Sequence, residues 1–165
     1  MGTRHLIEVK FNNEIKVAQY GQCDGYPTGQ GIGIANFISD KNNIAKLKEN
    51  LTKCRFWDKE KDKDFLEDYD SRSPTWSSDP DNRTEEQKEW YNNFISRDLG
   101  SDILENIAKS EKEEILLKDS SEFKKDGLFC EYHYLIDLDK EVVFLNNKEI
   151  TFADFTKEAM ENFED

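Results

Sequence analysis

The sequence has few of the residues that would mark a membrane protein or a secreted, disulfide-bonded protein. Its three cysteines, Cys23, Cys54 and Cys130, are far apart and form no CxxC pair, which predicts free thiols in a reducing compartment. No segment approaches the ~20 consecutive apolar residues of a membrane span. The N-terminus also lacks the apolar centre of a signal peptide. We therefore expect a cytoplasmic protein that does not bind membranes.

Histidine is equally scarce, and this limits metal binding. His133 shares one face of a predicted strand with Glu131 and Asp137, and His5 is the only other histidine in the sequence. Residues six positions apart on a strand are separated by ~20 Å, so Asp137 cannot join the other two in one coordination shell. We predict no metal site and no cofactor.

Positive charge is also in short supply. Lysine and arginine number 23 against 36 acidic residues, so the net charge is −13. This charge argues against direct binding of nucleic acid and favours a basic protein surface as partner. Aromatic residues make up 12% of the chain, enough to build one core from few large side chains. We expect residues 1–165 to form a single domain.

The N-terminal part of the chain predicts a β-hairpin, because two segments in it alternate apolar with polar side chains. A two-residue turn would set Val9 against Lys16, whereas a three-residue loop sets it against Ile15. We choose the three-residue loop, since it keeps apolar side chains together. It places His5 opposite Gln19, on the core-facing side at the open end of the hairpin.

The rest of the chain predicts helices and a second hairpin. Apolar spacing and capping residues predict helices over residues 32–38 and 44–54, and helices that begin at Thr84, Ser101 and Thr151. Residues 115–117 suggest an edge strand. Residues 128–138 show the strongest strand pattern, and residues 142–145 pair with them so that Ile136 meets Val143 and Tyr134 meets Leu145.

This order of elements predicts an α+β fold. Two hairpins separated by helices favour an antiparallel sheet of about four to five strands, with helices packed against it. Residues 55–83 show no clear period and form a long irregular acidic excursion in this interpretation. Within it, residues 58–70 carry seven acids against three lysines. Acidic runs of this kind are usually solvated surfaces.

A glycine-rich stretch over residues 19–31 is the most unusual part of the sequence. Glycine occurs where the backbone needs positive φ or close approach, so we predict an ordered loop between a strand and a helix. The candidate ligand- or partner-binding residues are His5, Gln19, Tyr20, Gln22, Asp24, Gly25, Tyr26 and Gln30.

Three interpretations of this loop stay open. Its N–H groups could hold a phosphate, although the Walker and dinucleotide spacings are absent. Cys23 and His5 could form a nucleophile–base pair, although no complete triad signature is present, so we assign no catalytic residue. The loop could also be a packed turn with a purely structural role, in which the glycines only allow the backbone conformation.

Several motifs resemble those of an uncharacterised family of small proteins found in bacteria, phages and fungi. The similarity rests on residues 1–7 (MGTRHLI), 18–22 (AQYGQ), 24–27 (DGYP), 29–31 (GQG), 128–132 (LFCEY) and 135–139 (LIDLD). The resemblance supports the bounds of the two hairpins and the importance of the loop, and it supplies no mechanism. Where this family carries an aromatic residue the chain has Cys23, which weakens a role for that thiol.

Two hypotheses for function follow. The first is an acidic protein-interaction module. The family's presence in phages favours an inhibitor or decoy that acts on a host defence protein or nucleic-acid-handling enzyme. The second is a small-ligand protein, binding or hydrolytic, with a nucleotide- or sugar-like ligand at the glycine-rich loop. Whether the chain is an enzyme stays open.

Overall fold

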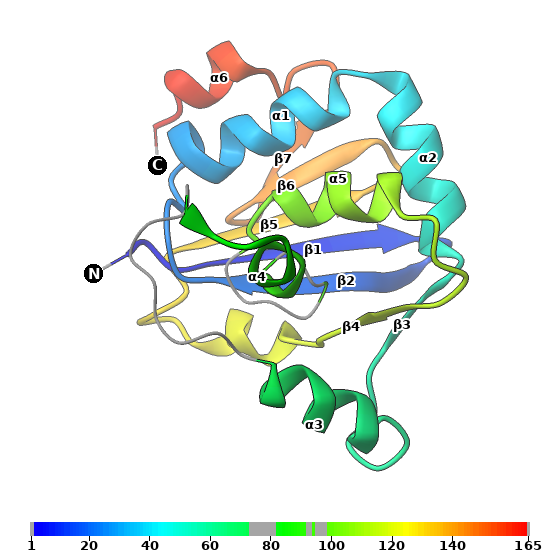
Figure 1. The fold of residues 1–165 in the computed structure, drawn as a ribbon. Coiled ribbons are helices and arrows are strands. Elements are labelled where there is room, and N and C mark those ends of the chain that lie inside the picture. Colours follow the sequence, from blue (N-terminus) through cyan, green and yellow to red (C-terminus); the bar gives the residue numbers. More distant parts are fainter. Residues whose placement is uncertain (1, 73–81, 92–93, 95–98, 165) are drawn as a thin grey trace.

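The computed structural model describes residues 2–72, 82–91, 94 and 99–164, and it shows an α+β fold. A five-stranded sheet with the order β2-β1-β5-β6-β7 forms its centre. Helices α1, α5 and α6 lie over one face of this sheet (Figure 1). The strands of the sheet are β1 (His5–Phe11), β2 (Glu14–Gly21), β5 (Tyr132–Asp137), β6 (Val142–Leu145) and β7 (Lys148–Thr151).

The remaining elements are short. A separate two-stranded parallel sheet consists of β3 (Cys54–Phe56) and β4 (Ile115–Leu117). The helices are α1 (Ile32–Ile38), α2 (Lys41–Leu51), α3 (Lys63–Ser71), α4 (Glu85–Tyr91), α5 (Asp102–Lys109) and α6 (Lys157–Glu161), with a π-helical turn η1 (Pro27–Gly31) and a 3₁₀ helix η3 (Ser121–Lys125). Among the described residues, no helix is long and apolar enough to span a membrane.

The main sheet is mixed, so the predicted antiparallel sheet is wrong in its central pairing. β1 and β5 run parallel, with His5 beside Tyr132 and Lys10 beside Asp137. Both predicted hairpins are present, and they meet through this parallel pair. Periodicity shows which side chains share a face but carries no information on which strand lies next to which.

The first hairpin also differs from its predicted register. Asn12 and Asn13 both have positive φ and form a two-residue turn. An irregularity in the ladder between Val9 and Lys10 leaves Lys16 without an opposite residue, so Val9 faces Val17. The bulge keeps apolar side chains together without the three-residue loop. His5 therefore faces Gly21 instead of Gln19.

The second hairpin forms as predicted. Ile136 faces Val143 and Tyr134 faces Leu145, and β5 is the central strand of the sheet. The strand begins only at Tyr132, so the first four residues of the predicted strand, 128–131, lie outside it. β7 continues from β6 through a turn at Asn146–Asn147, where both residues have positive φ, and it ends the sheet at one edge.

The predicted helix starts at Thr84 and Ser101 are confirmed, and Thr84 also forms its predicted cap. The Thr84 hydroxyl accepts from the Gln87 N–H at 3.1 Å, and Gln87 accepts from the Thr84 N–H at 2.9 Å, which is the predicted capping box. The predicted cap at Thr151 is wrong, because Thr151 lies in β7. Thr156 caps α6 instead, through the N–H of Ala159.

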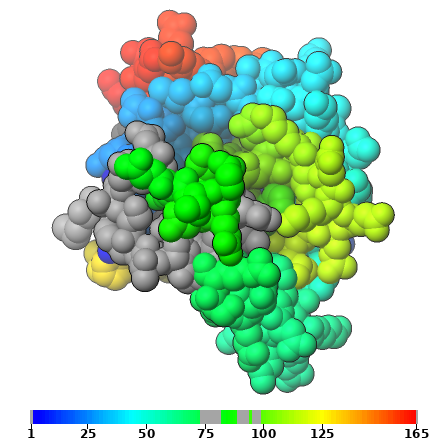
Figure 2. Space-filling view, in the orientation of Figure 1, coloured from blue at the N-terminus to red at the C-terminus, as the bar shows by residue number. Residues whose placement is uncertain are grey.

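The acidic excursion contains regular structure. Residues 63–71 form helix α3, which buries none of its side chains and projects from the body as a lobe (Figures 1 and 2). At its base, Arg55 forms two hydrogen bonds to Asp62, at 2.7 and 2.8 Å, and contacts Glu114 at 2.9 Å. The guanidinium of Arg55 lowers the pKa of the Asp62 carboxyl to about 2. Part of the predicted excursion, residues 73–81, lies outside the described residues.

Candidate functional site

The glycine-rich loop is an ordered corner whose backbone donors are already used. Four of its N–H groups donate to nearby carbonyls: Gly25 to Thr3 (3.0 Å), Gly29 to Tyr26 (2.8 Å), Gln30 to Asp24 (2.8 Å) and Gly31 to Tyr26 (3.3 Å). The hydroxyl of Tyr134 in β5 also donates to the carbonyl of Gly25 at 2.7 Å. Because these N–H groups point inward, the geometry does not favour a phosphate cradle.

Two glycines of the corner make room for one side chain. A Cβ atom on Gly21 would lie 2.1 Å from the imidazole of His5, and one on Gly25 would lie 2.8 Å from the Thr3 carbonyl oxygen. Any larger residue at these positions would displace the His5 ring or the start of β1. The predicted placement of His5 beside this loop is therefore confirmed, although its strand neighbour differs.

The imidazole of His5 is buried, with 1% of the residue exposed. Within the part of the chain that the structure describes, neither ring nitrogen has a hydrogen-bond partner. Burial lowers the pKa of His5, and this outweighs the opposite effects of the Thr3 backbone and the Asp24 carboxylate. His5 is therefore a neutral packing residue in this structure. Because neither ring nitrogen bonds to Cys23 or to any other described residue, the geometry does not favour the proposed nucleophile–base pair.

The other predicted site residues do not converge on one point. Tyr20 lies on the opposite face of the sheet from His5, with its ring 4.8 Å from that of Phe123. Gln19 is buried on the core-facing side. Gln30 turns away from the loop surface and accepts from the Ser101 N–H, at 2.8 Å, at the start of α5.

Asp24 and Tyr26 are the exposed ones among the predicted residues, and Tyr20, Gln22 and Gln30 are partly exposed. Asp24 has a φ of +57°, which turns the chain into η1. Tyr26 is 52% exposed, and its ring centroid lies 6.0 Å from that of Tyr132. Tyr132 is stacked in turn on the buried Tyr134, at 6.5 Å. Three tyrosines therefore connect the loop surface to the core.

An exposed apolar turn lies at the same end of the sheet, just before β5. Leu128 is 78% exposed and Phe129 is 46% exposed. The carboxylate of Asp126 accepts from the N–H groups of both residues, at 3.2 and 3.0 Å, and fixes the turn. The guanidinium carbon of Arg4 lies 4.8 Å from the centroid of the Phe129 ring. We call Asp126–Cys130 the apolar turn.

A cluster of polar and charged side chains around the buried Glu8 lies on the sheet face opposite helices α1, α5 and α6. Glu8 of β1 is 1% exposed, and its carboxylate lies 2.5 Å from Nε2 of His133 in β5. The ammonium of Lys124 in η3 lies 3.4 Å from the same carboxylate. This cluster joins three elements and was not predicted, because the sequence did not show that β1 and β5 are neighbours.

Two of the three cysteines, Cys54 and Cys130, have thiols that are not activated. Burial raises the pKa of the Cys54 thiol to about 12. The pKa of Cys130 rises to about 11, mainly through burial and also through the charges of Asp126 and Glu8. A nucleophilic thiol needs a lowered pKa, so Cys54 and Cys130 are unsuited to that role. Among the described residues no group of three or more His, Cys, Asp or Glu side chains could hold a metal ion.

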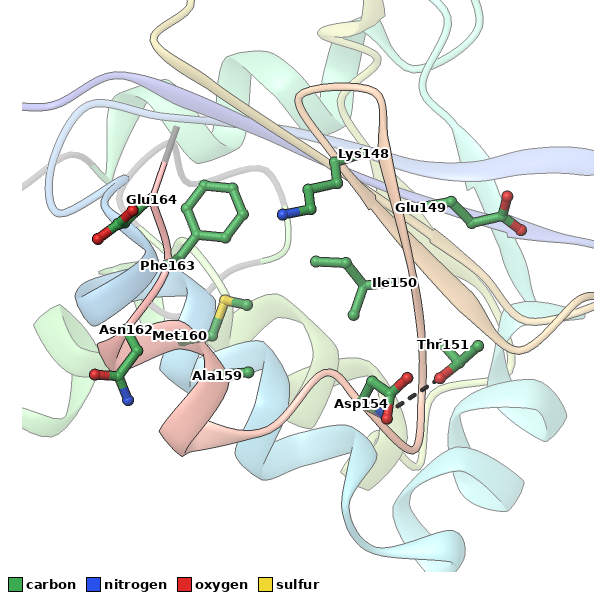
Figure 3. Close-up of a pocket in the computed structure, with 10 residues that line it drawn as sticks. All are labelled: Lys148, Glu149, Ile150, Thr151, Asp154, Ala159, Met160, Asn162, Phe163 and Glu164. Carbon is green, nitrogen blue, oxygen red and sulfur yellow. Dashed lines mark hydrogen bonds between the residues drawn. The ribbon is translucent and has the colours of Figure 1, made fainter.

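Two surface grooves flank the C-terminal segment. One, of about 660 Å³, lies between the edge strand β7 and α6, with the side chains of Ile150, Met160 and Phe163 in it (Figure 3). The other, of about 540 Å³, lies between α1 and the residues that precede α6, and Ile44 and Phe152 are among its apolar residues. Neither groove includes a residue of the glycine-rich loop.

Comparison with known proteins identifies no relative. No family model, no curated protein and no solved structure matches the chain. Its function must therefore be argued from its own geometry.

Proposed function

We propose that the chain is an acidic protein-binding module that uses the apolar turn as its anchor on a basic partner. The observation that carries this proposal is the exposure of Leu128 and Phe129 on a turn that Asp126 holds in place. A single exposed apolar residue is ordinary on a protein surface. Two large neighbouring ones, presented outward by a carboxylate cap, resemble the anchor residues of protein interfaces.

The rigidity of this turn favours binding. Arg4 stacks on Phe129, and the backbone N–H of Arg4 donates to the Glu131 carboxylate at 3.2 Å. The Glu131 N–H donates in turn to the Arg4 carbonyl, also at 3.2 Å. The turn is thus fixed to the start of β1 before a partner arrives. A pre-ordered anchor loses less conformational entropy on binding than a mobile loop does.

Charge supports a basic partner. The net charge is −13, and the lobe around α3, which projects from the body in Figure 2, carries exposed acids, among them Asp64, Glu67 and Asp70. Such a surface steers the chain toward a positive partner. Enzymes that handle nucleic acids present basic grooves, so the proposed partner is a host enzyme of this class, which the chain would inhibit or decoy.

The test compares the wild-type chain with a double variant, Leu128→Ser with Phe129→Ser. Immobilised protein captures partners from a bacterial lysate, and the captured proteins are identified by mass spectrometry. A partner that binds the wild type should be lost from the double variant. With the purified partner, we expect the affinity to fall about a hundredfold, as two anchor residues of about 1–2 kcal/mol each would give.

The matched control is Tyr26→Ser, which removes another exposed aromatic side chain from the same end of the sheet. Under the proposal it leaves capture unchanged. Because each of the three side chains is at least 46% exposed, every variant should remain folded under the capture conditions, which urea unfolding checks. The proposal fails if the double variant captures the same proteins as the wild type.

The alternative of a small-ligand site at the glycine-rich loop stays a prediction. Asp24 and Tyr26 are available at the surface, but four N–H groups of the loop already donate to its own or adjacent carbonyls. A nucleotide or sugar that raises the melting temperature of the wild type, and not that of Asp24→Ala or Tyr26→Ala, would favour this alternative.

A further inference from the structure

The edge strand β7 presents open backbone groups beside an apolar groove. In an antiparallel ladder, alternate residues direct their N–H and C=O groups to the same neighbour. The Phe152 N–H donates to the Glu141 carbonyl at 2.9 Å, so the alternation directs Ile150 toward β6 as well. The N–H and C=O of Glu149 and the N–H of Thr151 therefore face the open edge.

A second contact agrees with this assignment. The Thr151 carbonyl accepts from the N–H groups of Asp154 and Phe155, at 3.0 and 2.8 Å, so it points away from β6. The open edge ends at this carbonyl. Within the described part of the chain, three backbone groups have no partner there, enough to pair with a short extended segment.

The side chains of β7 separate into two faces. Lys148 and Ile150 point toward α6 and the groove, whereas Glu149 points the other way (Figure 3). The ammonium of Lys148 lies 5.2 Å from the centroid of the Phe163 ring. The apolar groove residues Ile150, Ala159, Met160 and Phe163 could accept every second side chain of a strand added to this edge.

Carboxylates lie on both sides of the edge strand. Asp154 and Glu164 line the groove together with the ammonium of Lys148, which already contacts an aromatic ring, and the Glu149 carboxylate lies on the other face of β7. A segment with lysine or arginine at alternate positions would place its charges beside Glu149 and its apolar side chains in the groove. The edge is thus complementary to a basic, alternating sequence in both backbone and side chains.

We propose that β7 and its groove bind an extended basic peptide segment of a partner protein, which joins the sheet as an additional strand. This surface is separate from the apolar turn. The proposal therefore goes beyond the proposed function and does not depend on it.

The first experiment titrates the ¹⁵N-labelled full chain with the acetylated, amidated peptide Lys-Val-Lys-Ile-Lys-Val-Lys. We expect the amide signals of Glu149 and Thr151 to shift and their hydrogen exchange to slow. The exchange of Ile150, whose N–H faces β6, should stay unchanged. Shifts confined to the apolar turn would overturn the proposal.

The second experiment uses two N-methylated forms of the same peptide with wild-type protein. An added strand directs only every second N–H toward β7, so methylation of one alternate set should weaken binding at least about tenfold. Methylation of the other set should leave binding nearly intact. Equal affinities of the two peptides, whether retained or lost, would overturn the proposal.

Variants of the chain separate backbone pairing from charge. Glu149→Pro removes an outward N–H without removing a bond to β6, and we expect at least about a tenfold loss of affinity. Glu149→Gln should weaken binding less. Glu161→Gln is the matched control: the Glu161 carboxylate contacts Lys157 on α6, and its loss should not weaken binding. Leu128→Ser with Phe129→Ser should bind the peptide like the wild type, which separates this proposal from the first. Equal effects of Glu149→Gln and Glu161→Gln would contradict the local role of Glu149.

Discussion

The single residue with the clearest effect on the fold is His5, whose ring fills the space that Gly21 and Gly25 leave open. Its burial without a hydrogen-bond partner among the described residues makes its neutral form the one compatible with the native state. Protonation of His5 at low pH should therefore destabilise the corner that connects β2 to α1.

We predict that acid destabilises the protein through His5. Its pKa is lowered in the folded state, so the unfolded state binds the proton more readily. The contribution is fully present above the unfolded pKa of ~6.5. It is lost as the pH falls toward the lower folded pKa, with a slope of up to about 1.4 kcal/mol per pH unit.

The measurement is urea unfolding of the wild type and of His5→Asn at pH 7.5 and 5.5. The variant should be less stable than the wild type at pH 7.5, and it should lose less stability between the two pH values. His133→Asn serves as a control for the second histidine. Equal losses in the wild type and in His5→Asn would rule out this role.

At the level of elements, the cluster of Glu8, His133 and Lys124 joins β1, β5 and η3. A buried carboxylate is costly unless it is paired, and His133 is its closest partner. We predict that His133→Gln costs about 2 kcal/mol of unfolding free energy, because the buried Glu8 carboxylate loses its closest hydrogen-bond partner. Lys124→Met should cost less, about 1 kcal/mol or below, because that side chain is partly exposed.

A double-mutant cycle checks this coupling. Glu8→Gln combined with His133→Gln should cost less than the sum of the two single changes, since the buried charge is then absent. Lys125→Met, which removes an exposed contact to Glu122, is the control and should be nearly neutral. Additive costs for Glu8 and His133 would show that the two side chains act independently.

Local signals predicted the elements better than they predicted how the elements meet. The bounds of α1, the capping box at Thr84 and the pairing of Ile136 with Val143 all follow from neighbouring residues, and all are confirmed. The parallel pairing of β1 with β5 depends on the packing of the whole chain, which periodicity does not contain. The bulge at Lys16 was missed because only uninterrupted registers were considered.

The same limit applies to the candidate site. The corner beside His5 was predicted from its glycines. The apolar turn was missed because Leu128 and Phe129 were assigned to the following strand. The Asp126–Gly127 pair was the available signal, because Asp-Gly marks a turn. The Glu8–His133 contact needed the sheet order, so no sequence signal pointed to it.

For the molecule as a whole, net charge acts in opposite directions on stability and on binding. Like charges repel more strongly in the compact state, so we predict that added NaCl raises the unfolding free energy of the isolated chain. The same salt should slow association with a basic partner. Thermal unfolding and stopped-flow association over one salt series measure both effects.

The control for the stability effect is a variant of the projecting lobe, Glu60→Gln with Asp64→Asn and Asp70→Asn. It removes three exposed charges far from the core, so its stability gain on adding salt should be smaller than that of the wild type. An equal gain in both proteins would show that self-repulsion is not the source of the effect.

The parallel contact between residues 5–10 and residues 132–137 also constrains biosynthesis. The first hairpin leaves the ribosome early, yet the strand that completes its inner side is translated only after all the helices except α6. Until β5 is translated, one edge of β1 has no hydrogen-bonded neighbour strand. The apolar face of β1 also lacks part of the core that packs against it in the folded protein. Such contacts between distant segments form slowly. The nascent chain is therefore most exposed to chaperones, and to pairing with other nascent chains, just before Tyr132 emerges.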